Sequence, residues 1–376
     1  MMHVPFLDLG IQLPLIAEEI EARFKDIIAN ASFILGHYVV EFEREFAKAQ
    51  GARYCLGVSS GTDALHLAML TLGIGPGDAV ALPVNTFFAT AEAVSLTGAT
   101  PVFVDHDQTF HLDPDVLKDG LKQAAATPEG NTLKAIIPVH LYGQPADMDR
   151  ITEVAAEFGL MVIEDCAQSH LATWRGFKTG TFGSFGAFSF YPGKNLGAWG
   201  EAGALVTNDE ALYNKARCIR QHGEVQRYVH KYVGHNYRME NFQGAVLGVK
   251  LRHLAGWTEQ RRANARLYDH LLGDIEEIEI PVSRDEAESV HHLYVVQAER
   301  RDELQLFLKE KGVITGLHYP IPLHLQEAYQ DLGYKRGDFP KAEASCERIL
   351  SLPMYPELTE EQISYVCNCL RAFYST

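Results

Sequence analysis

The chain of 376 residues is 47% hydrophobic and 22% charged, and its 33 basic and 49 acidic side chains give a net charge of −16. A chain of this length can bury a large core without disulfides or metals, and at roughly 150 residues per domain it suggests two or three structural units. The acidic balance argues against a general nucleic-acid or membrane-surface binder, because its field repels phosphate polymers. It is compatible with a small anionic ligand held by a local site.

The six cysteines lie at scattered spacings without a CxxC pair. We therefore expect neither a disulfide framework nor a bound metal. The N-terminal residues lack a basic segment followed by an apolar stretch, and no window reaches about 18 consecutive apolar residues. We expect a soluble cytoplasmic protein with no membrane contact.

From Tyr54 to about Asp209, short apolar runs alternate with longer amphipathic segments, a pattern typical of a mostly parallel sheet covered by helices. The predicted strands are Tyr54–Val58, Ala79–Leu82, Pro101–Val104, Ala135–Val139, Leu160–Ile163, Ala187–Phe190 and Ala204–Val206. The predicted helices between them are Thr62–Leu72, Ala89–Leu96, Pro114–Ala125 and Asp147–Phe158. The pattern predicts an α/β fold with a sheet of about seven strands.

Other segments flank this region on both sides. Amphipathic segments at Leu15–Ala29 and Val39–Ala49 precede it, and a helical pattern follows it as far as about Leu271, including a connecting helix over Phe242–Leu254. A smaller α+β unit then has predicted strands at Tyr294–Gln297 and Ile314–His318, and predicted helices at Arg301–Lys311, Phe339–Ile349 and Glu360–Phe373. We expect a large domain with the N-terminal helices over residues 1–250, and a linking helix with a small domain over residues 251–376.

Ser59, Ser60, Gly61 and Thr62 lie directly between a predicted strand and an amphipathic helix. Gly61 lets the backbone approach a ligand closely, and the first N–H groups of the helix point at an anion such as phosphate. A serine or threonine here can also cap the helix without any ligand. This motif alone leaves both interpretations open.

Asp165 ends the apolar run that contains the strand predicted at Leu160–Ile163. A poorly solvated carboxylate stays ionised only if it meets a cation or several hydrogen-bond donors, and a protonated pyridine nitrogen is one such cation. A helix cap or a structural ion pair would explain the same residue.

Lys194 lies in a turn rich in glycine and proline, after the strand predicted at Ala187–Phe190. Its neighbours are aromatic or small, and none of the five residues before it is a carboxylate. Partial burial would lower the pKa of this lysine to about 7–8, which frees the amine to attack a carbonyl. The ordinary alternative is a solvated surface lysine. Ser189 offers a hydroxyl at the same strand end.

A phosphate cradle, a buried acid and an activated lysine are together the contacts that pyridoxal 5′-phosphate (PLP) requires. The lysine links to the aldehyde of PLP, and the carboxylate keeps the ring nitrogen protonated so that the ring accepts electrons. Phe87 follows the strand predicted at Ala79–Leu82 and is a candidate to cover the ring, although ordinary core packing explains it as well.

Nine ordered blocks resemble those of the DegT/StrS-type sugar aminotransferases, a fold-type I PLP family that acts on nucleotide-linked keto sugars. The blocks are PFLDL, SSGTDAL, PVNTFFAT, TPVFVD, IEDCAQSH, SFYPGKNLGAWGEAGALVTND, GHNYRMENFQGAVLGVKL, HYPIPLHLQ and SLPMYPELTEEQI. They span nearly the whole chain. The resemblance implies a seven-stranded large domain and a smaller C-terminal α+β domain.

The resemblance also implies roles for individual residues. Lys194 would bind the cofactor and move the proton, Asp165 would pair with the ring nitrogen, and Gln168 would contact the ring hydroxyl. The phosphate would be held by Gly61, Thr62 and Ser189, with Phe87 over the ring. Asn236 matches a residue that, in this family, reaches the phosphate of the cofactor bound to the neighbouring subunit. The resemblance therefore implies at least a homodimer. His318 and Tyr319 match positions near the sugar.

The reaction implied by the family is ping-pong, in which glutamate gives its amine to PLP and a nucleotide-diphosphate keto sugar receives it. We expect a 3-keto-6-deoxyhexose as acceptor, because HYPIPLHLQ is most similar to members that aminate carbon 3. A 4-keto sugar and a cyclitol ketone stay open as alternatives. The anionic nucleotide requires local cations, for which Arg220, Arg227, Lys231 and Arg238 are candidates unless they form an ordinary solvated face.

Three other interpretations compete. A sugar dehydratase of the same family has histidine in place of the lysine, which Lys194 contradicts. An NAD-dependent sugar reductase needs a glycine-rich run between a strand and a helix, whereas Gly73–Gly77 follows a predicted helix. A non-catalytic PLP-binding regulator would need a DNA-binding module, and no basic helix-turn-helix is recognisable.

Overall fold

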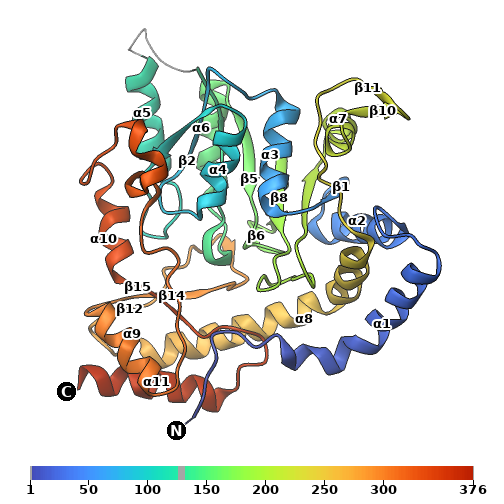
Figure 1. Ribbon diagram of the computed structural model, residues 1–376. Helices are drawn as coiled ribbons and strands as arrows, with labels where there is room; N and C mark the ends of the chain where they lie inside the picture. Colours follow the sequence, from blue (N-terminus) through green and yellow to red (C-terminus); the bar gives the residue numbers. More distant parts are fainter. Residues whose placement is uncertain (1, 126–131, 376) are drawn as a thin grey trace.

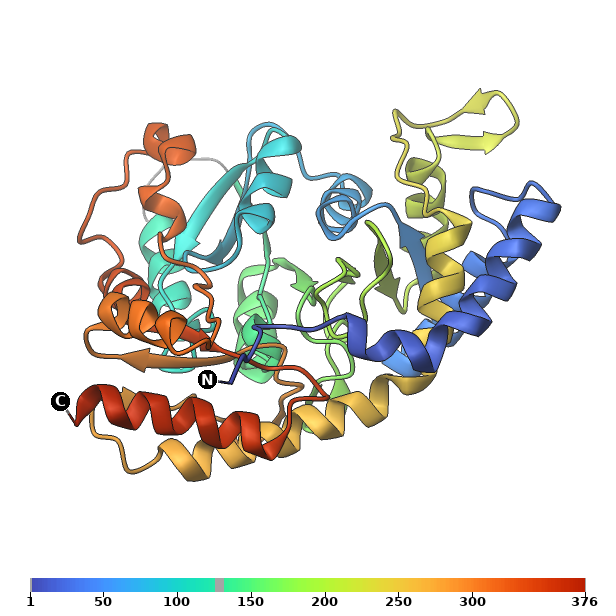
Figure 2. The ribbon, with the colours of Figure 1, turned by 60° about the horizontal axis from the view of Figure 1, so that its bottom comes forward.

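The structure, a computed structural model, describes residues 2–125 and 132–375 (Figures 1 and 2). Its centre is a seven-stranded sheet in the order β1-β9-β8-β5-β4-β2-β3. The strands are β1 (Tyr54–Val58), β2 (Asp78–Pro83), β3 (Thr100–Val104), β4 (Thr132–Ile136), β5 (Met161–Asp165), β8 (Phe185–Ser189) and β9 (Gly203–Thr207). Only β9 runs antiparallel to its neighbours. The prediction of a mostly parallel sheet of seven strands is confirmed.

Helices α3 (Gly61–Leu72), α4 (Phe88–Leu96), α5 (Pro114–Ala125) and α6 (Met148–Phe158) connect these strands as predicted. In α3, the apolar side chains of Leu65, Ala68 and Met69 are buried in the core between the helix and the sheet. Ser60 begins this helix as its cap, and Gly73 ends it with φ of 80°, a conformation that glycine adopts without strain.

A second group of helices runs along the side of the sheet layer. Helix α8 (Asn241–Leu272) is the longest and packs against α1 (Leu13–Ala29), α2 (His37–Gln50) and α11 (Glu360–Tyr374). Figure 2 shows α8 passing from the corner formed by α1 and α2 to the C-terminal helix. The expected boundary between residues 250 and 251 falls inside this continuous helix, which also extends well beyond the predicted Phe242–Leu254.

The C-terminal part contains a three-stranded sheet of β12 (Ile278–Glu279), β14 (Tyr294–Ala298) and β15 (Ile349–Leu352). Helices α9 (Arg301–Glu310), α10 (Pro340–Arg348) and α11 accompany it, with short 3-10 turns at Leu323–Leu325 and Glu327–Leu332. Elsewhere in the described residues, 3-10 turns lie at Gly10–Gln12 and Leu141–Gly143. No helix within the described residues combines the length and apolar character needed to cross a membrane.

One expectation for this part was wrong, and one strand was missed. The segment Ile314–His318 is not a strand, because only Gly316 forms a bridge, to Ser351, and β15 occupies the place beside β14. The helix expected at Phe339–Ile349 is observed as α10 over Pro340–Arg348, and the strand β15 that directly follows it was not predicted.

The helical pattern expected between Asp209 and Leu271 is also interrupted. After α7 (Glu210–Arg220), the chain forms a hairpin of β10 (Glu224–Gln226) and β11 (Val229–His230) that projects from the molecule (Figure 1). Three short strands that were not predicted, β6 (Thr173–Trp174), β7 (Phe177–Lys178) and β13 (Ala287–Glu288), form another small sheet.

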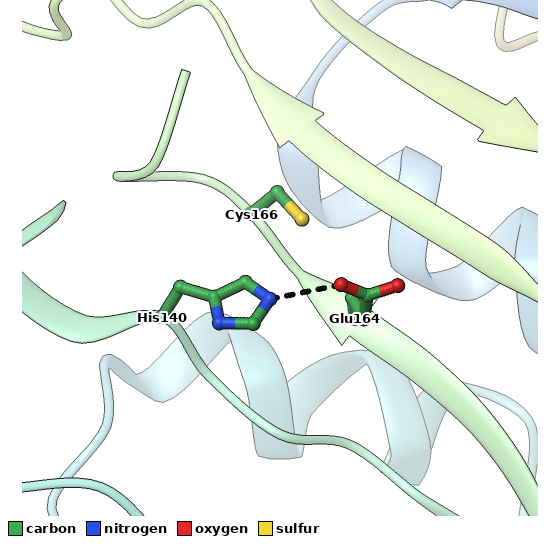
Figure 3. Close-up of side chains that lie close together, drawn as sticks. All are labelled: His140, Glu164 and Cys166. Carbon is green, nitrogen blue, oxygen red and sulfur yellow. Dashed lines mark hydrogen bonds and ion pairs between the residues drawn. The ribbon is translucent and has the colours of Figure 1, made fainter. Parts of the chain in front are cut away.

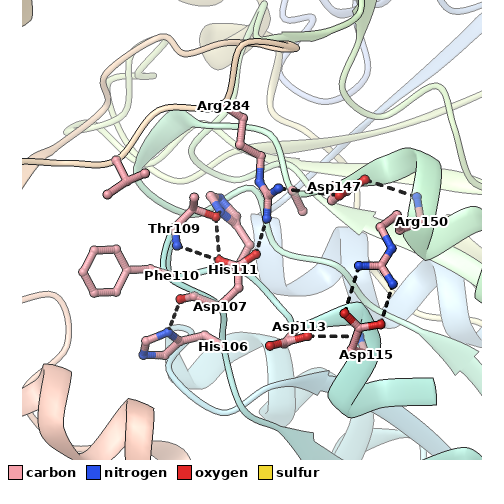
Figure 4. A network of polar contacts seen from close by, with 12 residues as sticks. His106, Asp107, Thr109, Phe110, His111, Asp113, Asp115, Asp147, Arg150 and Arg284 are labelled. Atoms are coloured by element: carbon pink, nitrogen blue, oxygen red, sulfur yellow. Dashed lines mark hydrogen bonds and ion pairs between the residues drawn. The ribbon is translucent and has the colours of Figure 1, made fainter. Parts of the chain in front are cut away.

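Contacts at the end of β3 attach α10 and the segment before β13 to the large sheet. The carboxylate of Asp105 accepts hydrogen bonds from the backbone N–H groups of Lys341 and Ala342, both at 3.0 Å, in the first turn of α10. The guanidinium of Arg284 pairs with Asp107 and lies 3.6 Å from Asp147 (Figure 4). A surface depression of about 580 Å³ beside this network is lined largely by charged side chains that pair with one another.

We expect Asp105→Ala to lower the free energy of unfolding by about 1–3 kcal/mol, because two N–H groups at a helix start, one of them buried, lose their acceptor. Urea unfolding measures this change. Glu45→Ala, which removes a partly exposed ion pair with Arg44, is the control and should change stability by about 0.5 kcal/mol or less. Equal stability of the Asp105 variant and the unmodified protein would contradict the proposed attachment.

Candidate active site

A cavity of about 640 Å³ lies at the edge of the sheet where the parallel strands have their carboxyl ends. The turns after β1, β2, β5 and β8 all contribute to its wall. Open α/β sheets bind their ligands at this edge. Of the predicted site residues, the cavity is lined by Gly61, Thr62, Phe87, Asp165, Gln168, Ser189, Lys194, His318 and Tyr319.

The turn after β1 forms a cradle at the start of α3. The hydroxyl of Ser60 accepts a hydrogen bond from the Asp63 backbone N–H at 3.1 Å, which caps the helix. A Cβ atom on Gly61 would lie 2.6 Å from the Cβ of Ser189, so the close approach of the two turns requires glycine. The first N–H groups of a helix have no acceptor within it and attract anions. Capping by Ser60 and anion binding at Gly61 and Thr62 are therefore compatible.

Asp165 ends β5 and is buried. Its Oδ1 accepts a hydrogen bond from the Ala167 backbone N–H at 3.0 Å, and its Oδ2 accepts one from the Thr90 hydroxyl at 2.8 Å. Burial raises the pKa of this carboxyl, whereas the two hydrogen bonds and the nearby Lys194 amine oppose the rise. Each oxygen retains a lone pair, which suits a protonated ring nitrogen.

Lys194 lies in the turn after β8, where its backbone N–H donates to the Tyr191 carbonyl at 2.8 Å. Burial in the cavity lowers the pKa of its amine to about 8, although the Asp165 carboxylate partly opposes this shift. A minor but appreciable fraction of the amine is therefore neutral near physiological pH, far more than for an ordinary lysine. The neutral amine is the form that attacks an aldehyde.

Gln168 has its amide held in one orientation. Its Oε1 accepts the Tyr142 backbone N–H at 2.6 Å, and its Nε2 donates to the Tyr319 hydroxyl at 3.2 Å. The donor end of the amide thus faces the cavity side on which Tyr319 lies and suits an acceptor such as a ring oxygen. Burial raises the pKa of Tyr319, so this phenol stays protonated.

Phe87 and His318 lie at other parts of the cavity wall. The side chain of Phe87 is 54% exposed and its ring centroid lies 5.2 Å from that of Tyr319, so ordinary core packing does not explain it. The ring of His318 stacks on Phe6, and its Nδ1 lies 2.8 Å from the Ser351 hydroxyl. Burial lowers the pKa of His318 to about 4, which keeps the ring neutral.

The sequence did not reveal Tyr142 and His292. Tyr142 fixes Gln168 through its backbone, and its hydroxyl donates to the His318 carbonyl. His292 lines the cavity, and its Nδ1 lies 3.1 Å from Oδ1 of Asn195, the residue after Lys194. The pair of histidines just before β14 could have indicated His292, whereas no motif marks Tyr142.

Asn236 and Arg238 do not line this cavity. They belong to a segment beside β1, where Arg238 bridges Val58 and its Nε donates to the Asn236 side chain at 2.9 Å. Arg220 was expected as a cation for the substrate. It is buried and forms an ion pair with Glu43 at 2.9 Å, so its charge is already paired inside the protein. Arg227 and Lys231 are exposed at the β10–β11 hairpin.

His140, Glu164 and Cys166 form the one group of potential metal ligands within the described residues (Figure 3). The Glu164 carboxylate accepts hydrogen bonds from His140 and from the backbone N–H groups of Gly180, Phe182 and Gly183. The other ring nitrogen of His140 accepts the Ala146 N–H at 3.1 Å. The side chains of His140 and Glu164 thus have hydrogen-bond partners within the protein, and these contacts explain the cluster without a metal. They hold the end of β5 in place next to Asp165.

The cavity residues fit PLP in three respects. A cradle that a single Cβ would fill lies at a helix start, a buried carboxylate has oxygens available for a ring nitrogen, and a partly neutral amine faces the same space. The glycine run at Gly73–Gly77 begins at the C-terminal cap of α3 and leads into β2, so it does not form a dinucleotide site. The fold and the site define a PLP-dependent aminotransferase of fold type I.

The chain belongs to the DegT/DnrJ/EryC1/StrS aminotransferase family, which it matches over residues 14–371. It is 45% identical to the pleiotropic regulatory protein of Geobacillus stearothermophilus over 99% of both chains. It is 42% identical to a dTDP-3-amino-3,4,6-trideoxy-α-D-glucose transaminase of Streptomyces venezuelae, over 98% of this chain and 96% of that one. Its structure matches DesV of S. venezuelae, solved in complex with a ketimine intermediate, with a TM-score of 0.95, 41% identity and full coverage of both chains. The chain is an aminotransferase, and its cofactor is PLP.

The lowered pKa of Lys194 predicts how the apoprotein combines with PLP at different pH. The rate constant for covalent attachment should rise with pH as the amine loses its proton, with a midpoint near pH 8. Asp165→Asn removes the carboxylate that favours the charged amine, so it should move the midpoint to lower pH. Absorbance stopped-flow measures the rate. A midpoint near the ordinary lysine value of about 10.4 would contradict the burial of the amine.

Proposed function

We propose that this aminotransferase transfers the amine of L-glutamate to a keto sugar carried on a nucleoside diphosphate, and that the acceptor carbon is carbon 3 of a 6-deoxyhexose. The observation that carries the proposal is the Lys194 amine, partly neutral, in one cavity with the buried Asp165 and the cradle at Gly61. The name of the S. venezuelae relative, a 3-amino sugar transaminase, supports carbon 3.

Each residue of the site has a proposed task. When bound, PLP supplies an aldehyde that accepts and releases an amino group, and a ring that withdraws electrons from the adjacent carbon. Lys194 Nζ takes a proton from the α carbon of the amino donor and passes it to the cofactor. Asp165 holds a negative charge at the ring nitrogen, and the amide of Gln168 donates to the ring oxygen.

The cradle and the cavity mouth position the two ligands. The N–H groups of Gly61 and Thr62 and the hydroxyl of Ser189 hold the cofactor phosphate, and Phe87 covers the ring. His318 and Tyr319 contact the sugar from the C-terminal part of the chain. Arg238 is a candidate for the charged nucleotide, together with the exposed cations of the hairpin.

We further propose that the active unit is a homodimer in which Asn236 and Arg238 reach the cavity of the partner. Both residues lie outside the cavity of their own chain. Exposed apolar side chains gather nearby, at the α1–α2 corner and the β10–β11 hairpin, which lie on the same side of the molecule (Figures 1 and 2). They include Ile28, Phe33, Ile34, Val40, Tyr228 and Val233. Exposed apolar side chains that gather on one side of a molecule favour an interface there.

A 4-keto sugar or a cyclitol ketone is the second candidate acceptor, because the cavity contacts that bind PLP do not distinguish these ketones. The name of the G. stearothermophilus relative suggests a regulatory role. Catalysis is favoured for this chain because the amine, the acid and the phosphate cradle meet in one cavity.

Absorbance changes of the purified protein test the proposal. L-glutamate alone should convert the PLP absorbance to that of the pyridoxamine form, and a nucleotide-linked 3-keto sugar should restore it faster than a 4-keto sugar or an inosose. Lys194→Ala should lower turnover by about 10²–10⁴-fold, since proton transfer loses its base. Lys178→Ala, which removes a half-buried lysine outside the cavity, is the matched control and should keep normal rates. Failure of every nucleotide-linked ketone to restore the absorbance would refute the proposed acceptor.

A further inference from the structure

Thr90 has a hydrogen bond that is unusual for a threonine in a helix. Buried threonines in helices commonly donate to the carbonyl four residues earlier, as Thr71 does to Leu67 and Thr258 does to Leu254. Thr90 lies in the first turn of α4, and its hydroxyl donates instead to Oδ2 of Asp165 at 2.8 Å. Because Thr90 is the third residue of this helix, the residue four positions earlier, Thr86, precedes the helix, and the Thr90 hydroxyl donates to a carboxylate on another element.

A second hydroxyl extends this contact. Oγ1 of Thr86 lies 2.9 Å from Oγ1 of Thr90, and both side chains are buried. An ionised carboxylate can only accept, so the single hydroxyl proton of Thr90 is used on Asp165. Thr86 must then donate to Thr90. The chain of hydrogen bonds has one direction, from Thr86 through Thr90 to Asp165, and each bond polarises the next.

We propose that Thr86 and Thr90 are positioning residues of the transamination, because their directed hydroxyl chain keeps the Asp165 carboxylate ionised and oriented toward the cofactor ring nitrogen. The inference rests on the proposed PLP chemistry and deepens it. Thr90 and the Ala167 N–H each occupy one carboxylate oxygen, which fixes the plane of the carboxyl group. Asp165 also lies at the N-terminal turn of α4, where the helix dipole favours negative charge.

Loss of the Thr90 hydroxyl has a defined electronic consequence. With one donor fewer, Asp165 becomes a stronger base, and the proton that it shares with the ring nitrogen moves toward the carboxylate. The ring then carries less positive charge and withdraws electrons less strongly. Thr90→Val is nearly isosteric and removes only the hydroxyl, Thr90→Ser restores it, and Thr86→Val removes the outer member of the chain.

The direct readout is the ¹⁵N NMR signal of the ring nitrogen in holoenzyme reconstituted with ¹⁵N-labelled PLP. The unmodified protein should show a pyridinium signal, Thr90→Val should shift it toward neutral pyridine, and Thr86→Val should shift it less in the same direction. Thr90→Ser should keep the original position. The matched control is Thr71→Val, which removes a buried helix hydroxyl away from Asp165 and should leave the signal unchanged.

A second readout needs no cofactor. Burial raises the pKa of Asp165 and the Thr90 hydrogen bond opposes this, so the variant carboxyl should have a still higher pKa in the folded apoprotein. A carboxyl whose folded pKa is raised contributes stability below its unfolded pKa, and this contribution is lost as pH rises through the folded pKa. Thr90→Val should therefore destabilise the apoprotein more at neutral pH than near pH 4, and Asp165→Asn should abolish that difference. The other titratable groups around Asp165 are Lys194, His140, Cys166 and Tyr319, and none of these substitutions removes them.

The kinetic expectation is a slower half-reaction with L-glutamate. Thr90→Val should lower its rate constant about tenfold, equivalent to about 1.4 kcal/mol, whereas Thr90→Ser and Thr71→Val should stay within about twofold. An unchanged ¹⁵N position and an unchanged half-reaction in Thr90→Val would overturn the inference. If glutamate fails to react with the unmodified protein while the ring-nitrogen shifts occur as expected, the proposed donor is wrong and the inference about Thr90 holds.

Discussion

The Lys194 amine and the Asp165 carboxylate are buried at one cavity, and in the proposed function the chemistry of the protein depends on this pairing. Burial raises the free energy of both charged forms, so it lowers the pKa of the amine and raises that of the acid. A neutral amine can bind an aldehyde, and an acid that retains its charge through donated hydrogen bonds can neutralise a protonated ring. With full solvation both groups would keep their ordinary pKa values, and the amine would then be almost entirely protonated near neutral pH.

The sheet brings these groups together. Parallel strands place their carboxyl ends at one edge, so the turns after β1, β5 and β8 meet although they are far apart in the sequence. Gly61 and Ser189 then approach so closely that a single Cβ would not fit between them. Beneath Asp165, Glu164 accepts four hydrogen bonds and holds the end of β5 in place. The long helix α8 and the contacts of Asp105 and Arg284 hold the C-terminal part, with His318 and Tyr319, against this edge.

The local pattern of the sequence was sufficient for the features that depend on short segments. The seven strands follow from alternating apolar runs, and the expected positions of Thr62, Asp165 and Lys194 follow from polar groups at the ends of those strands. The expected roles of Gln168, Asn236, His318 and Tyr319 came only from the family resemblance. Features that depend on distant partners were missed. Strand β15 continues an amphipathic helical pattern and becomes a strand only by pairing with β14. The segment Ile314–His318 has strand-forming residues, but it pairs with β15 through Gly316 alone. The apolar stripe of α8 drifts because the helix changes partners, from α1 near Val246 and Val249 to the C-terminal core near Tyr268 and Leu272. Tyr142 acts through its backbone N–H, which no residue type indicates.

The central claim is that the Lys194 amine forms the covalent bond to PLP in this cavity. Borohydride reduction of the holoenzyme, followed by digestion and mass spectrometry, tests it directly, because reduction makes that bond permanent. We predict that the mass of the reduced cofactor is found on the peptide containing Lys194 and on no other peptide. A label on a different lysine, or no label on a protein that retains its PLP absorbance, would contradict the account.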